Sequence, residues 1–113
     1  MKQPTESEIT RDIRKLLKGL GVFHWKVWQG PMSSPKGVSD IIGIAPGGQF
    51  LAIEIKAKGK KPTPLQQQYL EAVTEAGGVA IVAYSVEDVI KGLGVEGRFL
   101  NLSKKRHFLS GIT

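Results

Sequence analysis

The chain has 113 residues, which suits one domain around a single hydrophobic core, and its N-terminus lacks the apolar segment of a secretory signal, so we expect one domain over residues 1–113 in the cytoplasm. It has no cysteine and no apolar run near the roughly 20 residues that span a bilayer, which excludes disulfides, thiolate metal sites and a membrane helix. The 16 Lys and Arg residues outnumber the 10 Asp and Glu residues, and the formal charge of +6 favours polyanionic partners such as nucleic acids.

The first predicted element is a helix that begins after Thr5. Thr5 followed three residues later by Glu8 is a capping-box signature. Apolar residues then recur at helical spacing and define one face for burial: Ile9, Ile13, Leu16, Leu17 and Leu20. Gly19 or Gly21 would end the helix.

Glu6 has an unusual position on this helix. At about 100° per residue it lies on the core-facing side of the apolar stripe, whereas Glu8 lies on the other flank. A favourable interaction with the helix dipole would explain a carboxylate in the first turn. The alternative is that Glu6 contributes to a functional site.

Three strands are predicted next, because the segments are rich in β-branched and aromatic residues. A polar loop with two prolines separates the first strand from the other two, which flank the turn Pro46-Gly47-Gly48. The three strands cover residues 22–28, 38–45 and 49–57.

After a cationic loop, a helix is predicted over residues 64–78, with Pro64 in its first turn. Its apolar face would consist of Leu65, Tyr69, Val73 and Ala76. Residues 79–84 form a continuous apolar run, typical of a strand buried on both faces, and residues 85–94 form a short helix. The order α-β-β-β-α-β-α predicts an α/β fold with a mixed sheet flanked by helices.

The predicted hairpin brings charged side chains together. If it closes over Pro46-Gly47-Gly48, Asp40 lies directly opposite Glu54 on one face of the sheet. Directly opposed residues have Cβ atoms roughly 4.5–5.5 Å apart, and Lys56 lies diagonally beside this pair on the same side.

Two opposed carboxylates are destabilising unless one keeps its proton or a cation neutralises the pair. A salt bridge between Glu54 and Lys56 is the plain structural alternative. One lysine cannot balance two carboxylates, however, and Glu6 could add a third. An all-oxygen site with few protein ligands suits Mg²⁺ or Mn²⁺, and the backbone carbonyl of Ile55 could be a further ligand.

These residues also carry a family resemblance. Ser39-Asp40, thirteen further residues and EIK at 54–56 resemble the PD-(D/E)xK nuclease signature. Over residues 5–91 the sequence is similar to a stand-alone VRR-NUC domain, in the segments TESEI, KGVSDIIGIAPGGQFLAIEIKAKGKKPTPLQQQYLEAVTEAGG and AIVAYSVEDV. Residues 98–113 are then a C-terminal extension. Ser39 departs from the family's usual proline, which is not a ligand.

The resemblance implies a restriction-endonuclease-like fold and a Mg²⁺- or Mn²⁺-dependent phosphodiesterase. Its implied catalytic residues are Glu6, Asp40, Glu54, Lys56 and Gln66. Asp40 and Glu54 would be metal ligands, Glu6 could be a third, and Lys56 would orient or activate the attacking water. Glu6 would be the acid of the first helix, with Glu8 as the alternative. Gln66 matches a family glutamine that supports the site.

Basic side chains surround the predicted site. Lys58, Lys60 and Lys61 follow it directly. Such a cluster is usually only a solvated loop, but beside a phosphodiesterase centre it favours contact with the DNA backbone. Lys26 and Lys36 precede Asp40 and could line the substrate groove.

The predicted function is therefore a metal-dependent DNA endonuclease. The fold adds little bulk around the site, which favours recognition of DNA shape over base sequence. Stand-alone members of the family resemble Holliday-junction resolvases, which implies branched or four-way DNA as substrate and a homodimer with two matched sites. Two alternatives stay open: a non-catalytic basic nucleic-acid-binding module, and a sequence-preferring restriction or mobile-element endonuclease.

Overall fold

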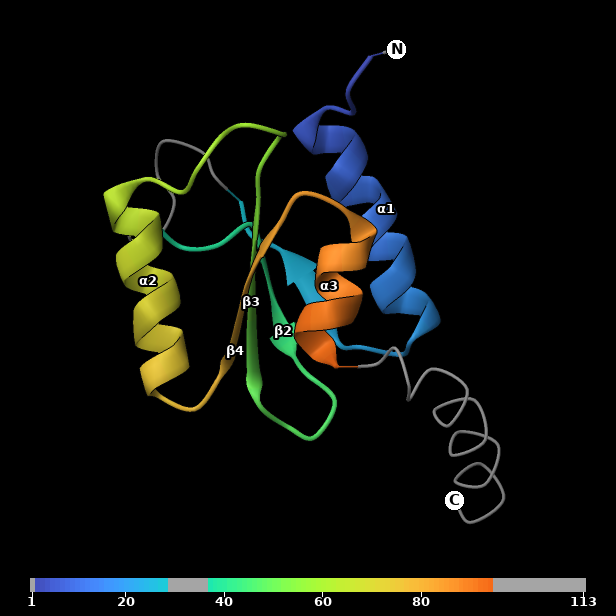
Figure 1. Cartoon of the computed structure of the whole chain (residues 1–113). Helices are drawn as coiled ribbons and strands as arrows, with labels where there is room; N and C mark the ends of the chain where they lie inside the picture. The colour runs from blue at the N-terminus through green and yellow to red at the C-terminus, as the bar shows by residue number, and fades with distance from the viewer. Residues whose placement is uncertain (1, 29–36, 95–113) are drawn as a thin grey trace.

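The structure is a computed structural model that describes residues 2–28 and 37–94. Two sequence predictions, a DNA-binding role for Lys36 and a C-terminal extension over 98–113, lie outside the described residues. The elements follow the predicted order α-β-β-β-α-β-α (Figure 1). They are α1 (Glu6–Gly19), β1 (His24–Lys26), β2 (Ile41–Ile44), β3 (Phe50–Ile55), α2 (Pro64–Glu75), β4 (Val79–Ala83) and α3 (Val86–Leu93).

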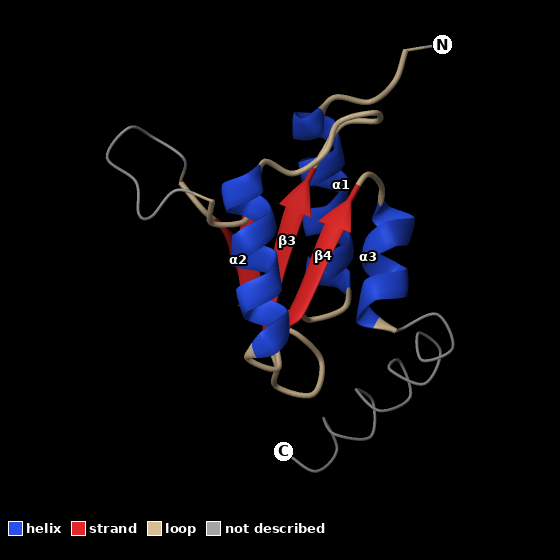
Figure 2. Cartoon of the chain, turned by 60° about the vertical axis from the view of Figure 1, so that its left-hand side comes forward, coloured by secondary structure: helices blue, strands red, loops and turns tan. Residues whose placement is uncertain are grey.

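The four strands form one mixed sheet in the order β1-β2-β3-β4. The β1–β2 and β2–β3 pairs are antiparallel, and β4 lies parallel to β3 because α2 carries the chain back across the sheet. Helix α2 covers one face, and α1 and α3 cover the other (Figure 2). The predicted α/β class with a mixed sheet between helices is therefore confirmed.

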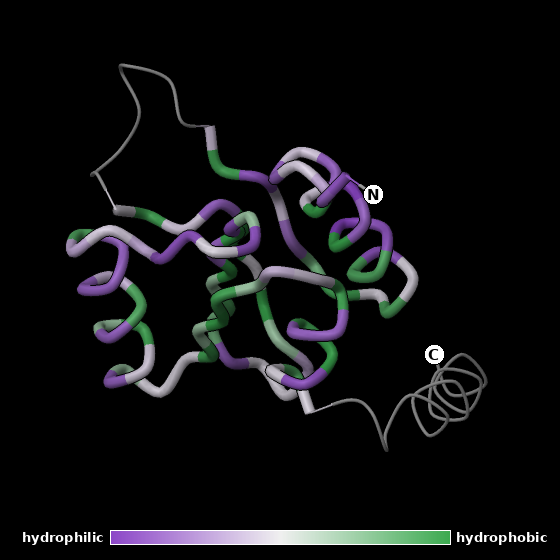
Figure 3. The backbone as a smooth tube through the Cα atoms, turned by 45° about the horizontal axis from the view of Figure 1, so that its top comes forward, coloured by the Kyte–Doolittle hydropathy of each residue, from purple (hydrophilic) through white to green (hydrophobic). Residues whose placement is uncertain are grey.

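The hydrophobic core is divided by the sheet into two parts. The larger part joins α1 and α3 to the sheet and contains the fully buried Ile13, Leu17, Ile41, Leu51 and Ile53. The smaller part lies under α2. The helices alternate between hydrophilic and hydrophobic residues along the chain, as Figure 3 shows, because each has one face toward the sheet and one toward water.

Helix α2 presents the predicted face only in part: Val73 is buried and Tyr69 packs beside it, but Leu65 and Ala76 are exposed. Leu70 and Val73 are buried against Ile42 and Ala52, whereas Leu65 is 51% exposed. The prediction missed Leu70, which packs in the same cluster as Tyr69 and Val73. The packing of α2 over β3 and β4 selects the stripe that contains Leu70.

Local signals at the ends of elements are confirmed. The hydroxyl of Thr5 accepts a hydrogen bond from the Glu8 N–H, and the Glu8 carboxylate accepts one from the Thr5 N–H, so α1 begins with a complete capping box. Ala45 N–H donates to the Gln49 carbonyl at 2.7 Å, which closes the predicted hairpin. No helix in the described part of the chain is long and apolar enough to cross a membrane.

Candidate active site

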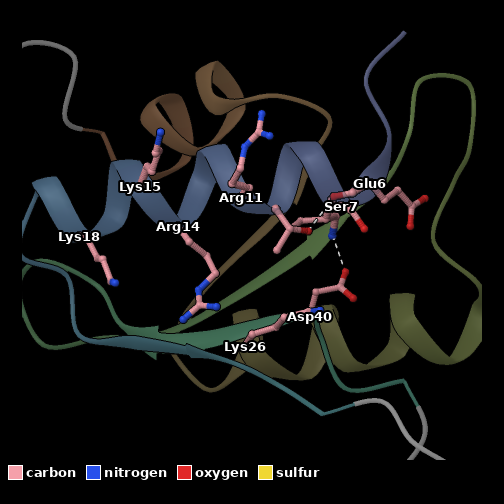
Figure 4. Close-up of a pocket in the computed structure, with 10 residues that line it drawn as sticks. Glu6, Ser7, Arg11, Arg14, Lys15, Lys18, Lys26 and Asp40 are labelled. Carbon is pink, nitrogen blue, oxygen red and sulfur yellow. Dashed lines mark hydrogen bonds between the residues drawn. The ribbon is translucent and has the colours of Figure 1, made fainter. Parts of the chain in front are cut away.

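Asp40 lies where β2 begins, and both ends of the residue are held by neighbouring strands. Its carbonyl accepts a hydrogen bond from the Val27 N–H at 2.8 Å. Its carboxylate accepts one from the Ile55 N–H at 2.7 Å, drawn as a dashed line in Figure 4. In a continued antiparallel ladder this N–H would bond to the carbonyl of residue 39. The Asp40 side chain takes the place of that carbonyl, which fixes the carboxylate at the end of the sheet.

Glu54 is the partner of Asp40 on β3. The observed register pairs Ile42 with Ala52, as predicted, and its continuation places Asp40 opposite Glu54. Glu54 is only 1% exposed, and its Oε1 atom is buried without a hydrogen-bond partner within the described residues. Its Oε2 atom lies 3.9 Å from Lys56 Nζ, a distance at the outer limit of an ion pair.

The surroundings of Glu54 disfavour its charged form. Burial is the main cause that raises the pKa of Glu54 to about 8. A hydrogen bond to Asp40, which requires that one carboxyl keep its proton, and the charges of Asp40 and Glu6 raise this pKa further, whereas Lys56 lowers it. Lys56 therefore compensates the acidic pair only in part.

The donor atoms here fit a divalent cation. The unpartnered Glu54 Oε1 beside the Asp40 carboxylate is an oxygen position that a cation would satisfy. Within residues 2–28 and 37–94, no three acidic or imidazole side chains gather closely enough to form a metal site alone. Mg²⁺ is nonetheless bound in many enzymes by one or two carboxylates, waters and substrate phosphate. Ile55, whose carbonyl is the further predicted ligand, lines the same pocket as Asp40.

The two candidate acids of α1 have different environments. The Glu6 carboxylate accepts a hydrogen bond from the Ala57 N–H at 3.1 Å, which ties α1 to the chain just beyond β3. Glu6 also lines a pocket with Asp40. The Glu8 carboxylate is occupied at the N-cap, and its hydrogen bonds with Thr5 lower the pKa of Glu8. Glu6 is thus the α1 acid that the fold places beside Asp40.

Gln66 has a structural contact of its own. Its side-chain oxygen accepts a hydrogen bond from the Thr63 N–H at 2.9 Å, and its own N–H donates to the Thr63 hydroxyl. Gln66 therefore completes a capping box at the start of α2. Its catalytic role stays a prediction. Ser39 is fully buried, and its hydroxyl has no hydrogen-bond partner in the described part of the chain.

A groove of about 570 Å³ extends from Glu6 and Asp40 along α1 (Figure 4). Glu6 and Asp40 line it at one end, and the remaining charged residues in its walls are all cations: Arg11, Arg14, Lys15, Lys18 and Lys26. Lys26 was predicted to face the substrate, but the four α1 cations were missed. Their positions follow the i, i+3, i+4, i+7 pattern of one helix face, which the sequence contained.

The predicted DNA-binding loop lies elsewhere. Lys58, Lys60 and Lys61 are exposed in the segment that joins β3 to α2. The Tyr84 hydroxyl donates to the Lys60 carbonyl at 2.6 Å, which attaches this loop to the end of β4. None of these three lysines lines the groove along α1.

Comparison with solved structures identifies the fold. One similar structure, described as a VRR_NUC domain, is 25% identical and covers 76% of this chain and 90% of its own, with a TM-score of 0.62. Another, described as a VRR_NUC domain protein, is 24% identical and covers 90% of this chain and 93% of its own, with a TM-score of 0.65. No family model and no curated protein matches the sequence. The chain therefore has the VRR-NUC fold that the sequence resemblance implied.

Proposed function

We propose that this chain, which has the VRR-NUC fold, is a divalent-metal-dependent nuclease that hydrolyses phosphodiester bonds in DNA. The fold supports a nuclease of the PD-(D/E)xK type in general. The proposal depends mainly on one observation: Asp40 and Glu54 lie side by side at the end of the sheet, and Glu54 has a buried oxygen without a partner.

The residues of the site have distinct roles in this proposal. Asp40 and Glu54 would hold Mg²⁺ or Mn²⁺ together with the Ile55 carbonyl. When bound, such an ion supplies positive charge and Lewis acidity beside the phosphate. The hydrogen bond from Ile55 N–H keeps the Asp40 carboxylate oriented before any ligand arrives, so little reorganisation is needed.

Lys56 would act on the reacting phosphate. Its side chain is only 14% exposed and lies beside Glu54 rather than in open solvent. An ammonium group in this low-dielectric position stabilises the negative charge that develops on the phosphate oxygens, and it orients the attacking water. Glu6 would accept hydrogen bonds from the same water or from the ligand shell of the cation.

The direct test is a cleavage assay with labelled four-way, flap, splayed and linear DNA, in Mg²⁺, in Mn²⁺ and in EDTA. We expect cleavage that depends on the metal, is lost in Asp40→Asn and Glu54→Gln, and is retained in Glu87→Gln, which removes an exposed carboxylate from α3. DNA binding by the two site variants should persist. Binding without cleavage of any substrate in either metal would contradict the proposal and support a non-catalytic binding module.

We further propose that the substrate is branched DNA and that the enzyme acts as a homodimer. A four-way junction has two-fold symmetry, and a symmetric dimer would present one active site to each of the two strands that are cut. Preferential cutting of the four-way substrate is the expected result. A single chain per complex by light scattering, with and without junction DNA, would contradict the dimer. Cutting confined to one short sequence would indicate a restriction-type activity instead.

A further inference from the structure

We propose that the groove along α1 binds the DNA backbone on one side of the scissile phosphate and that Arg14 holds one phosphate in register. This inference rests on the proposed nuclease function, since it takes the acidic end of the groove as the cleavage site. It assigns a DNA-binding surface separate from the Lys58–Lys61 loop.

The first observation is the geometry of the groove. Its acidic end contains Glu6 and Asp40, and the cations extend away from that end along α1 (Figure 4). From Glu6 to Lys18 the helix rises about 18 Å at 1.5 Å per residue. One DNA strand carries a phosphate about every 3.4 Å along the helix axis, so this length corresponds to roughly five phosphates.

The second observation is that, within the described residues, all of the groove cations except Arg11 lack an acidic partner. Arg11 pairs with Asp12 at 3.1 Å, and both side chains are exposed. In the ranges 2–28 and 37–94, the only other ion pair joins Lys56 to Glu54, so it involves none of Arg14, Lys15, Lys18 or Lys26. Unpaired positive charges that line one groove repel each other and attract a polyanion. A run of phosphates is the ligand that matches this charge and this length.

Arg14 carries the most specific signal in the groove. It is half-buried, and its Nε atom is withdrawn from water without a hydrogen-bond partner in the described residues. Figure 4 shows its side chain reaching from α1 toward the strand that carries Lys26. A guanidinium group is planar and binds phosphate oxygens with two parallel hydrogen bonds, which a lysine cannot do. A phosphate in the groove would supply the acceptor that Nε lacks.

The geometry predicts a one-sided footprint. Groove cations extend in one direction from Asp40, so neutral methylphosphonate linkages should weaken binding at up to about five positions on one side of the cut. In Arg14→Gln the loss of affinity caused by a neutral linkage should become smaller at one of these positions, because that variant lacks the side chain that binds one phosphate. Interference that is equal on both sides and unchanged in Arg14→Gln would overturn the proposal.

Binding affinity tests the charges independently of cleavage. We would measure DNA affinity in EDTA over a range of salt concentrations for Lys15→Gln/Lys18→Gln and for a matched control, Lys2→Gln/Lys91→Gln, which removes two exposed lysines outside the groove. Each lost phosphate contact should reduce the salt slope by about 0.7–0.9, so the groove variant should lose about 1.5 in slope and the control almost nothing. Equal salt slopes in the two double variants would refute the proposal that the groove binds DNA.

Arg14 has its own conservative control. Arg14→Lys keeps the charge and should keep the salt slope, but it should lose affinity because the paired hydrogen bonds are gone. Arg14→Gln should lose both affinity and slope. Thermal melting of each variant shows whether folding is intact, and the exposed Lys15 and Lys18 test the groove even if Arg14 variants unfold. If the protein does not cleave DNA but its binding still follows these patterns, the nuclease proposal is refuted and the groove proposal stands. If the protein cleaves DNA but the groove variants bind it as the wild type does, the groove proposal is refuted and the nuclease proposal stands.

Discussion

Replacing Glu54 by Gln should remove most of a pH-dependent loss of stability. The pKa of Glu54 rises from 4.5 to about 8 on folding, mainly because of burial. Below about pH 4.5 both folded and unfolded states carry the proton, and the group has no effect. Between about pH 4.5 and 8 the unfolded chain ionises while the folded chain retains its proton, so folding becomes less favourable as the pH rises.

The size of this loss follows from the pKa change. One unit of difference in pKa between the folded and unfolded states is worth about 1.4 kcal/mol. Above pH 8 the full loss of folding free energy is therefore at most about 5 kcal/mol. Gln has nearly the shape of Glu but no charge, so Glu54→Gln should match the wild type within about 1 kcal/mol near pH 4.5 and exceed it by several kcal/mol at pH 9.

The assay is urea unfolding in EDTA at pH values from 4.5 to 9, for wild type, Glu54→Gln and the surface control Glu87→Gln. The control should follow the wild type at every pH. A cation that binds only the folded state at 100 times its dissociation constant adds about 2.7 kcal/mol, so Mg²⁺ should stabilise the wild type at pH 9 and not Glu54→Gln. Parallel curves for wild type and Glu54→Gln would show that burial of Glu54 does not raise its pKa.

Three further substitutions test other parts of the structure. Lys56→Gln should lower the cleavage rate about 10²–10³-fold without a comparable loss of DNA affinity, and an unchanged rate would exclude its action on the transition state. Joint replacement of Lys58, Lys60 and Lys61 by Gln should reduce the salt slope of binding by about 2–3, and an unchanged slope would mean that the loop does not contact phosphates. Thr5→Ala should lower the free energy of unfolding by about 1 kcal/mol in urea titrations, because it removes the cap of α1; no change would show that the cap is dispensable.

Local sequence determined much of this protein. The capping box at Thr5, the register around Pro46-Gly47-Gly48 and the order of elements all depend on residues that are close in sequence. Strand side chains alternate, so once the turn is known the register places Asp40 opposite Glu54. The central acidic pair of the site could be predicted for this reason.

Packing between distant segments decided the rest. The hydrogen bond from Ala57 N–H to Glu6 joins residues 51 positions apart, and it exists because the apolar stripe of α1 docks on the sheet at one angle. The same docking brings the α1 cations into one groove with Lys26, and the seating of α2 buries Leu70 rather than Leu65. Helical periodicity defines faces on a helix, but only the tertiary contacts determine what each face meets.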